Sequence, residues 1–208
     1  LRRAGQDTAA SSWSVVLDRA SGLWMLCAIG GLGAAACAGV LAPWLELSPG
    51  AFVALLLAGT ALWLALPWAL PLVLRRWRPG WLAPLRTAVD RPDFNAQLGW
   101  QVLASVAVQL LSAAALAGGG LALGVQLSPA AWAFAIAPVF LMAALPVSVG
   151  GWGTREAAAV ASLAPFGVAA PAAVGVGVIY GLYQLAQGAM GALAFGLPGR
   201  GEKEGATE

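Results

Sequence analysis

Two charged residues, Arg155 and Glu156, stand alone in a long apolar stretch of this sequence. They close the segment 146–156, which reads P-V-S-V-G-G-W-G-T-R-E and contains three glycines, Gly150, Gly151 and Gly153. A charged side chain at membrane depth costs about 2.5–3.5 kcal/mol on insertion scales, so such residues usually mark a functional site. This polar, glycine-rich break between apolar segments is therefore the first candidate site.

The chemistry that this segment favours is anion binding. The glycines let the backbone turn with its N–H groups exposed, and a helix that begins at Thr154 would add the positive end of its dipole. Arg155 offers a forked donor suited to phosphate, and Glu156 suits a cationic group or a proton. We predict a substrate site from one group of residues: Ser148, Gly150, Gly151, Gly153, Thr154, Arg155 and Glu156.

An alternative stays open for the same segment: a helix break held by an internal ion-pair network, with Glu156 as a cap. Adjacent residues on a helix point about 100° apart. We therefore expect Arg155 and Glu156 to have different partners rather than to neutralise each other.

The amino-acid composition indicates the class of protein. Of the 208 residues, 60% are hydrophobic and 10% are charged, which indicates an integral membrane protein. The sequence has no histidine, no carboxylate cluster, no P-loop and no GxGxxG spacing. We accordingly predict no catalytic residue, no metal site, no cofactor and no enzyme activity. Cys27 and Cys37 lie in the first apolar run and are expected to pack as small apolar groups.

The elements that position the site are predicted to form an all-α, polytopic transmembrane helix bundle with a broken or re-entrant half-helix segment. Residues 154–164 are too few to cross a ~30 Å hydrocarbon core at 1.5 Å per residue. Longer helices are expected at about 23–41, 50–74, 97–123, 129–146 and 171–197. Pro67 and Pro71 should kink the second, and a neighbouring helix or water must then bond each freed carbonyl.

Topology follows from an arginine-rich loop. Its basic residues are Arg75, Arg76, Arg78, Arg86 and Arg91. By the positive-inside rule this loop is cytoplasmic, and we interpret it as an orientation signal rather than as a nucleic-acid or lipid-headgroup patch. The domain is predicted to span 1–198, with a disordered cytoplasmic tail at 199–208. The first residue is Leu1, and we expect the chain to be part of a longer protein.

Two polar stripes accompany the central segment. One follows helical spacing along 97–123: Gln101, Ser105, Gln109 and Ser112. The other lies on the last helix: Tyr180, Tyr183, Gln184 and Gln187. Unsatisfied amides in hydrocarbon cost several kcal/mol, so both stripes should face protein or a water-filled path, as interhelical bonds or as substrate contacts. Gly177, Gly181 and Gly188 are predicted to form a face for close helix packing.

The segment P-V-S-V-G-G-W-G-T-R-E, the last-helix run Y-G-L-Y-Q-L-A-Q-G-A-M-G and the opening S-V-V-L-D-R-A-S-G-L resemble the flippase-like family. That family is typified by the transmembrane region of bacterial lysylphosphatidylglycerol synthases, the multiple peptide resistance factors. The resemblance covers nearly the whole chain. No aminoacyl-transferase domain follows within the sequence, so synthase activity is not implied.

What the resemblance implies is a multi-pass protein of the bacterial cytoplasmic (inner) membrane that moves a lipid between leaflets. Its partners would be the bilayer and an anionic or aminoacylated phospholipid or a lipid-linked headgroup, with no nucleic acid. The alternative is a non-transporting scaffold or accessory subunit of a lipid-modifying enzyme or glycosyltransferase. An oligomer and a partner enzyme are both left open.

Overall fold

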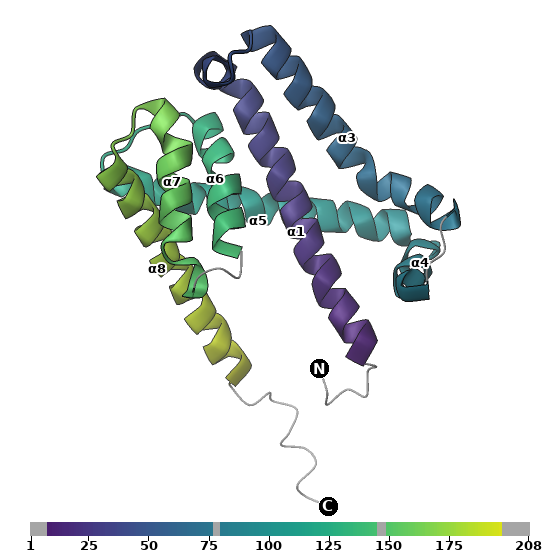
Figure 1. The fold of residues 1–208 in the computed structure, drawn as a ribbon. Coiled ribbons are helices and arrows are strands. Elements are labelled where there is room, and N and C mark those ends of the chain that lie inside the picture. Colours follow the sequence, from purple (N-terminus) through teal and green to yellow (C-terminus); the bar gives the residue numbers. More distant parts are fainter. Residues whose placement is uncertain (1–7, 77–79, 145–148, 197–208) are drawn as a thin grey trace, which may run out of the picture.

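The computed structural model describes residues 8–76, 80–144 and 149–196, and every regular element there is helical (Figure 1). The main helices are α1 (Thr8–Ala36), α3 (Pro49–Arg76), α5 (Phe94–Ala122), α6 (Pro129–Ala144), α7 (Thr154–Leu163) and α8 (Ala170–Gly196). The predicted all-α fold is confirmed, and α7 is the short half-helix that the sequence indicated. The expected tail and Ser148 lie outside the described residues.

Short helices make the connections. They are α2 (Ala38–Leu41), α4 (Ala83–Val89) and the 3₁₀ turns Ala42–Leu45, Gly80–Leu82, Val149–Gly151 and Ala164–Phe166. The prediction of an arginine-rich loop is wrong for 83–89, which forms α4. The reason is that Leu82 and Val89 pack with Leu74 at the end of α3, so this segment buries apolar side chains of its own.

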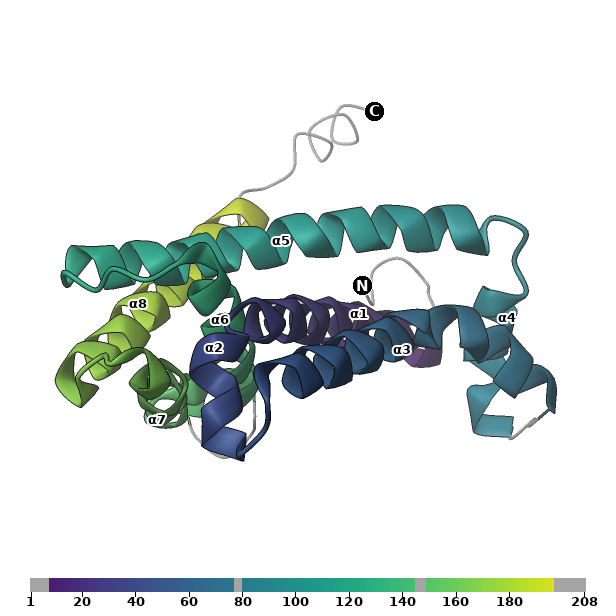
Figure 2. The ribbon, with the colours of Figure 1, turned by 90° about the horizontal axis from the view of Figure 1, so that it is seen from above.

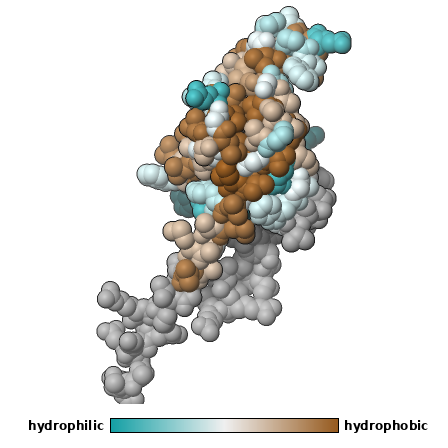
Figure 3. Space-filling view, turned by 90° about the vertical axis from the view of Figure 1, so that its left-hand side faces the viewer, coloured by the Kyte–Doolittle hydropathy of each residue, from teal (hydrophilic) through white to brown (hydrophobic). Residues whose placement is uncertain are grey.

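The chain is a membrane protein. Among the described residues, Pro49–Leu74 and Phe94–Ala122 are each long and apolar enough to cross a bilayer. A third candidate is Arg19–Ala36 with Ala38–Leu45, which are bent by 76° at Cys37. The sequence predicted one helix through this point, and nothing in it marks the bend. Apolar residues also gather at the centre of the face in Figure 3.

Helix α1 lies at the centre of the arrangement and contacts α3, α5 and α6 (Figure 1). In the view from above, α5 runs along one side of α1 and α3 and reaches from α8 to α4 (Figure 2). The largest apolar core lies where α5, α6, α7 and α8 meet. Its fully buried members include Leu116, Ile136, Val139, Leu163 and Val176. This core supports the N-terminal end of α7, where Arg155 and Glu156 lie.

Glycines allow α1 to approach α6 closely. A Cβ at Gly30 would lie 2.6 Å from Cβ of Ala137, and one at Gly33 would lie 2.8 Å from the carbonyl oxygen of Ala130. Both distances are below van der Waals contact, so only glycine fits. Small residues at helix interfaces are how membrane helices gain dispersion contacts without a hydrophobic driving force between them.

Two tryptophans join α1 to α3. The indole N–H of Trp24 donates to the carbonyl of Trp63 at 2.8 Å, and the indole N–H of Trp63 donates to the carbonyl of Trp24 at 2.9 Å. Pro67 follows Trp63 by four residues and has no N–H, so the Trp63 carbonyl lacks its helical donor. The prediction that a neighbouring helix must bond a freed carbonyl is confirmed at this position.

Trp24→Phe should therefore weaken the α1–α3 contact. The substitution keeps most of the ring but leaves the carbonyl of Trp63 without a donor, at a cost of about 1–3 kcal/mol. Thermal unfolding in detergent micelles measures the effect, and Trp100→Phe, at an exposed site on α5, is the matched control. Equal midpoints for the two variants would contradict this role for Trp24.

Candidate functional site

The backbone before α7 needs its glycines. Gly150, Gly151 and Gly153 have φ values of 64°, 77° and 84°, in the left-handed region that L side chains disfavour. Gly151 is also buried against α6, where a Cβ would lie 2.8 Å from the Cα of Ala143. The backbone turns at these glycines, as their pattern indicated, and α7 packs beside α6.

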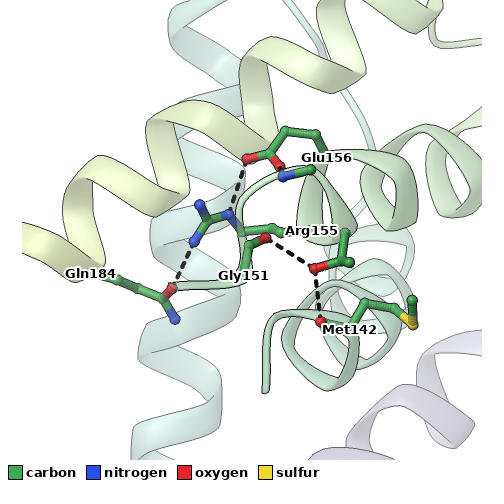
Figure 4. Close-up of polar contacts among 7 residues, drawn as sticks. Met142, Gly151, Arg155, Glu156 and Gln184 are labelled. Atoms are coloured by element: carbon green, nitrogen blue, oxygen red, sulfur yellow. Dashed lines mark hydrogen bonds and ion pairs between the residues drawn. The ribbon is translucent and has the colours of Figure 1, made fainter. Parts of the chain in front are cut away.

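Thr154 fixes the start of α7 to the end of α6. Its hydroxyl donates to the carbonyl of Met142 at 3.0 Å and to the carbonyl of Gly151 at 3.1 Å (Figure 4). The carbonyl of Met142 would normally accept a helical bond from residue 146, which is a proline without an N–H. The Thr154 hydroxyl supplies the missing donor, so this residue has a structural partner in place.

Glu156 caps α7 with its own side chain. Its Oε2 accepts from the backbone N–H of Gly153, and its Oε1 lies 3.3 Å from Nε of Arg155 (Figure 4). The expectation that these neighbours have different partners is wrong. The cap draws the carboxylate back to the helix start, where the long Arg155 side chain reaches it despite the angular offset. The helix N-terminus thus holds an internal anion.

Arg155 is 1% exposed and lies between α7 and α8. Its Nη1 donates to Oε1 of Gln184 at 3.1 Å, and its Cζ lies 4.8 Å from the ring centroid of Trp152. Its Nη2 is the one nitrogen of this guanidinium that has no partner within the described chain. Gly181 makes room for the group, because a Cβ there would lie 2.5 Å from Cζ.

A polar network extends from this pair to α5. Tyr180 is buried on α8 and interacts with Gln184 and with Ser112 of α5. We call the connected side chains the Arg155 network; they are Ser112, Tyr180, Gln184, Arg155 and Glu156. The network joins α5, α7 and α8 through groups that are mostly withdrawn from solvent, so it is well placed to hold these helices together.

The second predicted stripe runs from a buried to an exposed edge of α8, and the rings of Tyr180 and Tyr183 stack within it, with 6.3 Å between their centroids. Tyr180 and Gln184 belong to the Arg155 network, whereas Tyr183 and Gln187 lie on the exposed side of α8 and bond each other, with 3.0 Å between Oη and Nε2. The predicted glycine face is only partly correct. Gly177 and Gly181 contact Glu156 and Arg155, but Gly188 has nothing within 4 Å.

A partly polar cavity of about 650 Å³, called the polar cavity below, lies elsewhere, between α1, α5 and the end of α6. Its polar lining consists of Arg19, Ser21, Gln101, Ser105 and Gln109. Nε2 of Gln101 donates to the Ser21 hydroxyl at 2.7 Å, and Nε2 of Gln109 donates to the carbonyl of Gly22 at 3.1 Å. Both glutamines thus make the interhelical bonds that the sequence left open, and they also face a cavity.

The cavity and the Arg155 network are separate sites. No described side chain of α7 or α8 lines the polar cavity. A second depression, of about 490 Å³, is almost wholly apolar and lies between α1, α6 and α7 beside Cys27. Within the described ranges, no three His, Cys, Asp or Glu side chains come together in a way that could hold a metal ion.

Comparison with known proteins decides the family. The family model described as the lysylphosphatidylglycerol synthase TM region matches residues 1–191. The chain belongs to this family. No curated protein and no solved structure matches the chain.

Membership in the lysylphosphatidylglycerol synthase TM-region family confirms the resemblance found in the sequence. It relates the chain to membrane proteins of lipid modification or flipping. In this member, the predicted residues Gln101 and Gln109 meet at the cavity, while Arg155, Glu156, Tyr180 and Gln184 meet in the network.

Sequence reasoning missed Arg19, Ser21 and Trp152 as site residues. In the sequence, Arg19 stood out only as part of the opening run S-V-V-L-D-R-A-S-G-L. The signal that could have found it is the polar stripe of α5, which needs a polar partner on a neighbouring helix. Arg19 and Ser21 line the same cavity from α1. The position of Trp152 in the sequence does not predict its contact with Arg155. The contact depends on the backbone turns at Gly151 and Gly153.

Proposed function

We propose that this domain is a lipid flippase or transporter, which moves a phospholipid or a lipid-linked headgroup between the leaflets of the bacterial cytoplasmic membrane and crosses that membrane several times. It makes and breaks no covalent bond. The observation that carries the proposal is the polar cavity between α1 and α5, because it provides a polar surface among apolar helices where a headgroup can leave water without losing its hydrogen bonds.

Arg19 gives this cavity its charge. Among the described side chains, Arg155–Glu156 is the one ion pair, so no described carboxylate neutralises Arg19. A guanidinium matches phosphate geometry through paired N–H donors. We therefore assign the phosphate of the lipid to Arg19, and the apolar depression beside Cys27 offers a surface compatible with acyl chains.

The Arg155 network has a different role in this proposal. Its helix N-terminus already carries the carboxylate of Glu156, so a phosphate would have to displace that group and enter where Arg155 is buried. We assign the network to holding α7 against α8. The role of Arg155 as a phosphate ligand, and that of Glu156 with a cation or proton, stay predictions.

The burial of Arg155 also favours a second candidate function. If the network only stabilises a helix break, the domain is compatible with a scaffold that binds a lipid-modifying enzyme, a glycosyltransferase or a second copy of itself. In that case the cavity has no transport role. Variants in the cavity would then leave lipid movement unchanged, while variants in the network would reduce protein abundance and the recovery of the partner.

The test is translocation of a fluorescent anionic phospholipid in proteoliposomes that contain the full-length protein. Arg19→Gln should slow translocation about ten-fold or more, because a hydrogen bond to a charged group contributes about 1.5–3 kcal/mol. Arg91→Gln, at an exposed arginine outside the cavity, is the matched control. Translocation at the wild-type rate by correctly folded Arg19→Gln protein would overturn the transport proposal.

A further inference from the structure

We infer that the polar cavity selects a phosphodiester headgroup that carries a neutral hydroxyl, as a polyol or sugar does, and disfavours a cationic headgroup. The inference rests on the proposed function, since it names the lipid chemistry for the cavity already described. It concerns one acceptor atom, Oε1 of Gln109, and one cation, Arg19.

Gln109 is 3% exposed, and its side chain faces the cavity. Its Nε2 donates to the carbonyl of Gly22, which fixes the amide orientation, because the opposite orientation would place two carbonyl oxygens against each other. Its Oε1 is then left without a partner in the described part of the chain. A buried acceptor left unsatisfied costs about 1–3 kcal/mol, so a ligand that donates a hydrogen bond there gains that free energy.

The position of Arg19 limits what that donor can be. Arg19 precedes Gly22, the partner of Gln109, by three residues, a rise of about 4.5 Å along α1. A headgroup phosphate at Arg19 therefore places a short substituent near Oε1. That substituent must carry an N–H or O–H, so a trimethylammonium group does not fit.

The positive charge of Arg19 then decides whether the donor is a hydroxyl or an amine. Among the described side chains, the cavity lining contains Arg19 but no Asp or Glu. An ammonium group inside it would meet the like charge of Arg19 and no counter-charge among the described side chains. A hydroxyl donates the same hydrogen bond without this repulsion. The cavity therefore suits a glycerol or sugar phosphodiester better than an aminoacylated one.

The test is lipid retention by the full-length protein, measured by native mass spectrometry after exposure to vesicles of phosphatidylglycerol, phosphatidylcholine, lysyl-phosphatidylglycerol or a prenyl-linked sugar phosphate. The wild type should retain phosphatidylglycerol or the sugar phosphate about ten-fold over phosphatidylcholine. It should also retain one of them over the lysyl lipid. The two hydroxylated lipids distinguish a glycerophospholipid substrate from a prenyl-linked one.

Gln109→Leu should bring the preference over phosphatidylcholine close to one, while Gln126→Leu, at an exposed residue outside the cavity, should keep it. Gln109→Glu supplies a carboxylate and should shift retention toward the lysyl lipid, a gain that misfolded protein does not produce. Preferential retention of the lysyl lipid by the wild type, or an unchanged preference in both Gln109 variants, would overturn the inference. Selective retention without translocation would instead remove the proposed function and leave the inference standing.

Discussion

Glu156→Ala is expected to destabilise the domain by about 3–5 kcal/mol, the usual result of removing one partner from a buried ion pair. The substitution leaves the guanidinium of Arg155 charged, 1% exposed and without its counter-ion, and it removes the cap on Gly153. Loss of helical circular dichroism with denaturant in detergent micelles measures the change in unfolding free energy.

The double variant Arg155→Met/Glu156→Gln distinguishes charge from packing. It removes both charges together, and glutamine keeps an oxygen for the N–H of Gly153, so most of the lost stability should return. Asp90→Ala, which removes an exposed carboxylate beyond α4, serves as the surface control. A double variant as unstable as Glu156→Ala would show that the buried charge is not the cause.

The second large effect is expected at Gly181. A Cβ there would lie 2.5 Å from Cζ of Arg155, and the guanidinium is held on its other sides by Glu156 and Gln184. Gly181→Ala should therefore force α8 away from α7 and cost about 1–3 kcal/mol, as overpacking of a filled site does. Unfolding midpoints in detergent, together with the yield of folded protein, measure this cost.

Gly188→Ala is the matched control on the same helix. Nothing lies within 4 Å of a Cβ at this position, so the substitution should stabilise α8 by up to about 1 kcal/mol through helix propensity alone. The two alanine variants should thus have effects of opposite sign. A Gly181→Ala protein as stable as Gly188→Ala would mean that Arg155 lies elsewhere.

The sequence predicted the helices well because their ends carry local signals. Ser128 illustrates this, since its hydroxyl accepts from the N–H of Ala131 at 3.2 Å at the start of α6, as a Ser-Pro pair indicates. The bend at Cys37 could not be predicted, because Gly and Ala spacing there is compatible with a straight helix. The helix α4 was missed because its burial depends on Leu74, which belongs to another element.

The sequence predicted many of the residues that belong to the candidate site, but not which of their side chains contact each other. The stripe of α5 predicted that Gln101 and Gln109 share a face, and the cavity between α1 and α5 confirms it. The ion pair of Arg155 with Glu156 was missed, because helical angles describe Cβ directions and not the reach of long side chains. Tyr183 stacks against Tyr180 within the predicted stripe, but helical spacing alone could not tell that Tyr183 lies at the exposed edge of that stripe.

Helix α3 touches the rest of the molecule mainly through α1, and the two Trp24–Trp63 hydrogen bonds are polar links to that helix. Segments with few internal contacts open at a lower free energy than the core and do so as cooperative units. Amide hydrogen exchange should accordingly divide the domain into two kinetic classes. The amides of α3 would exchange through sub-global opening, and those around Leu116 and Ile136 only through complete unfolding.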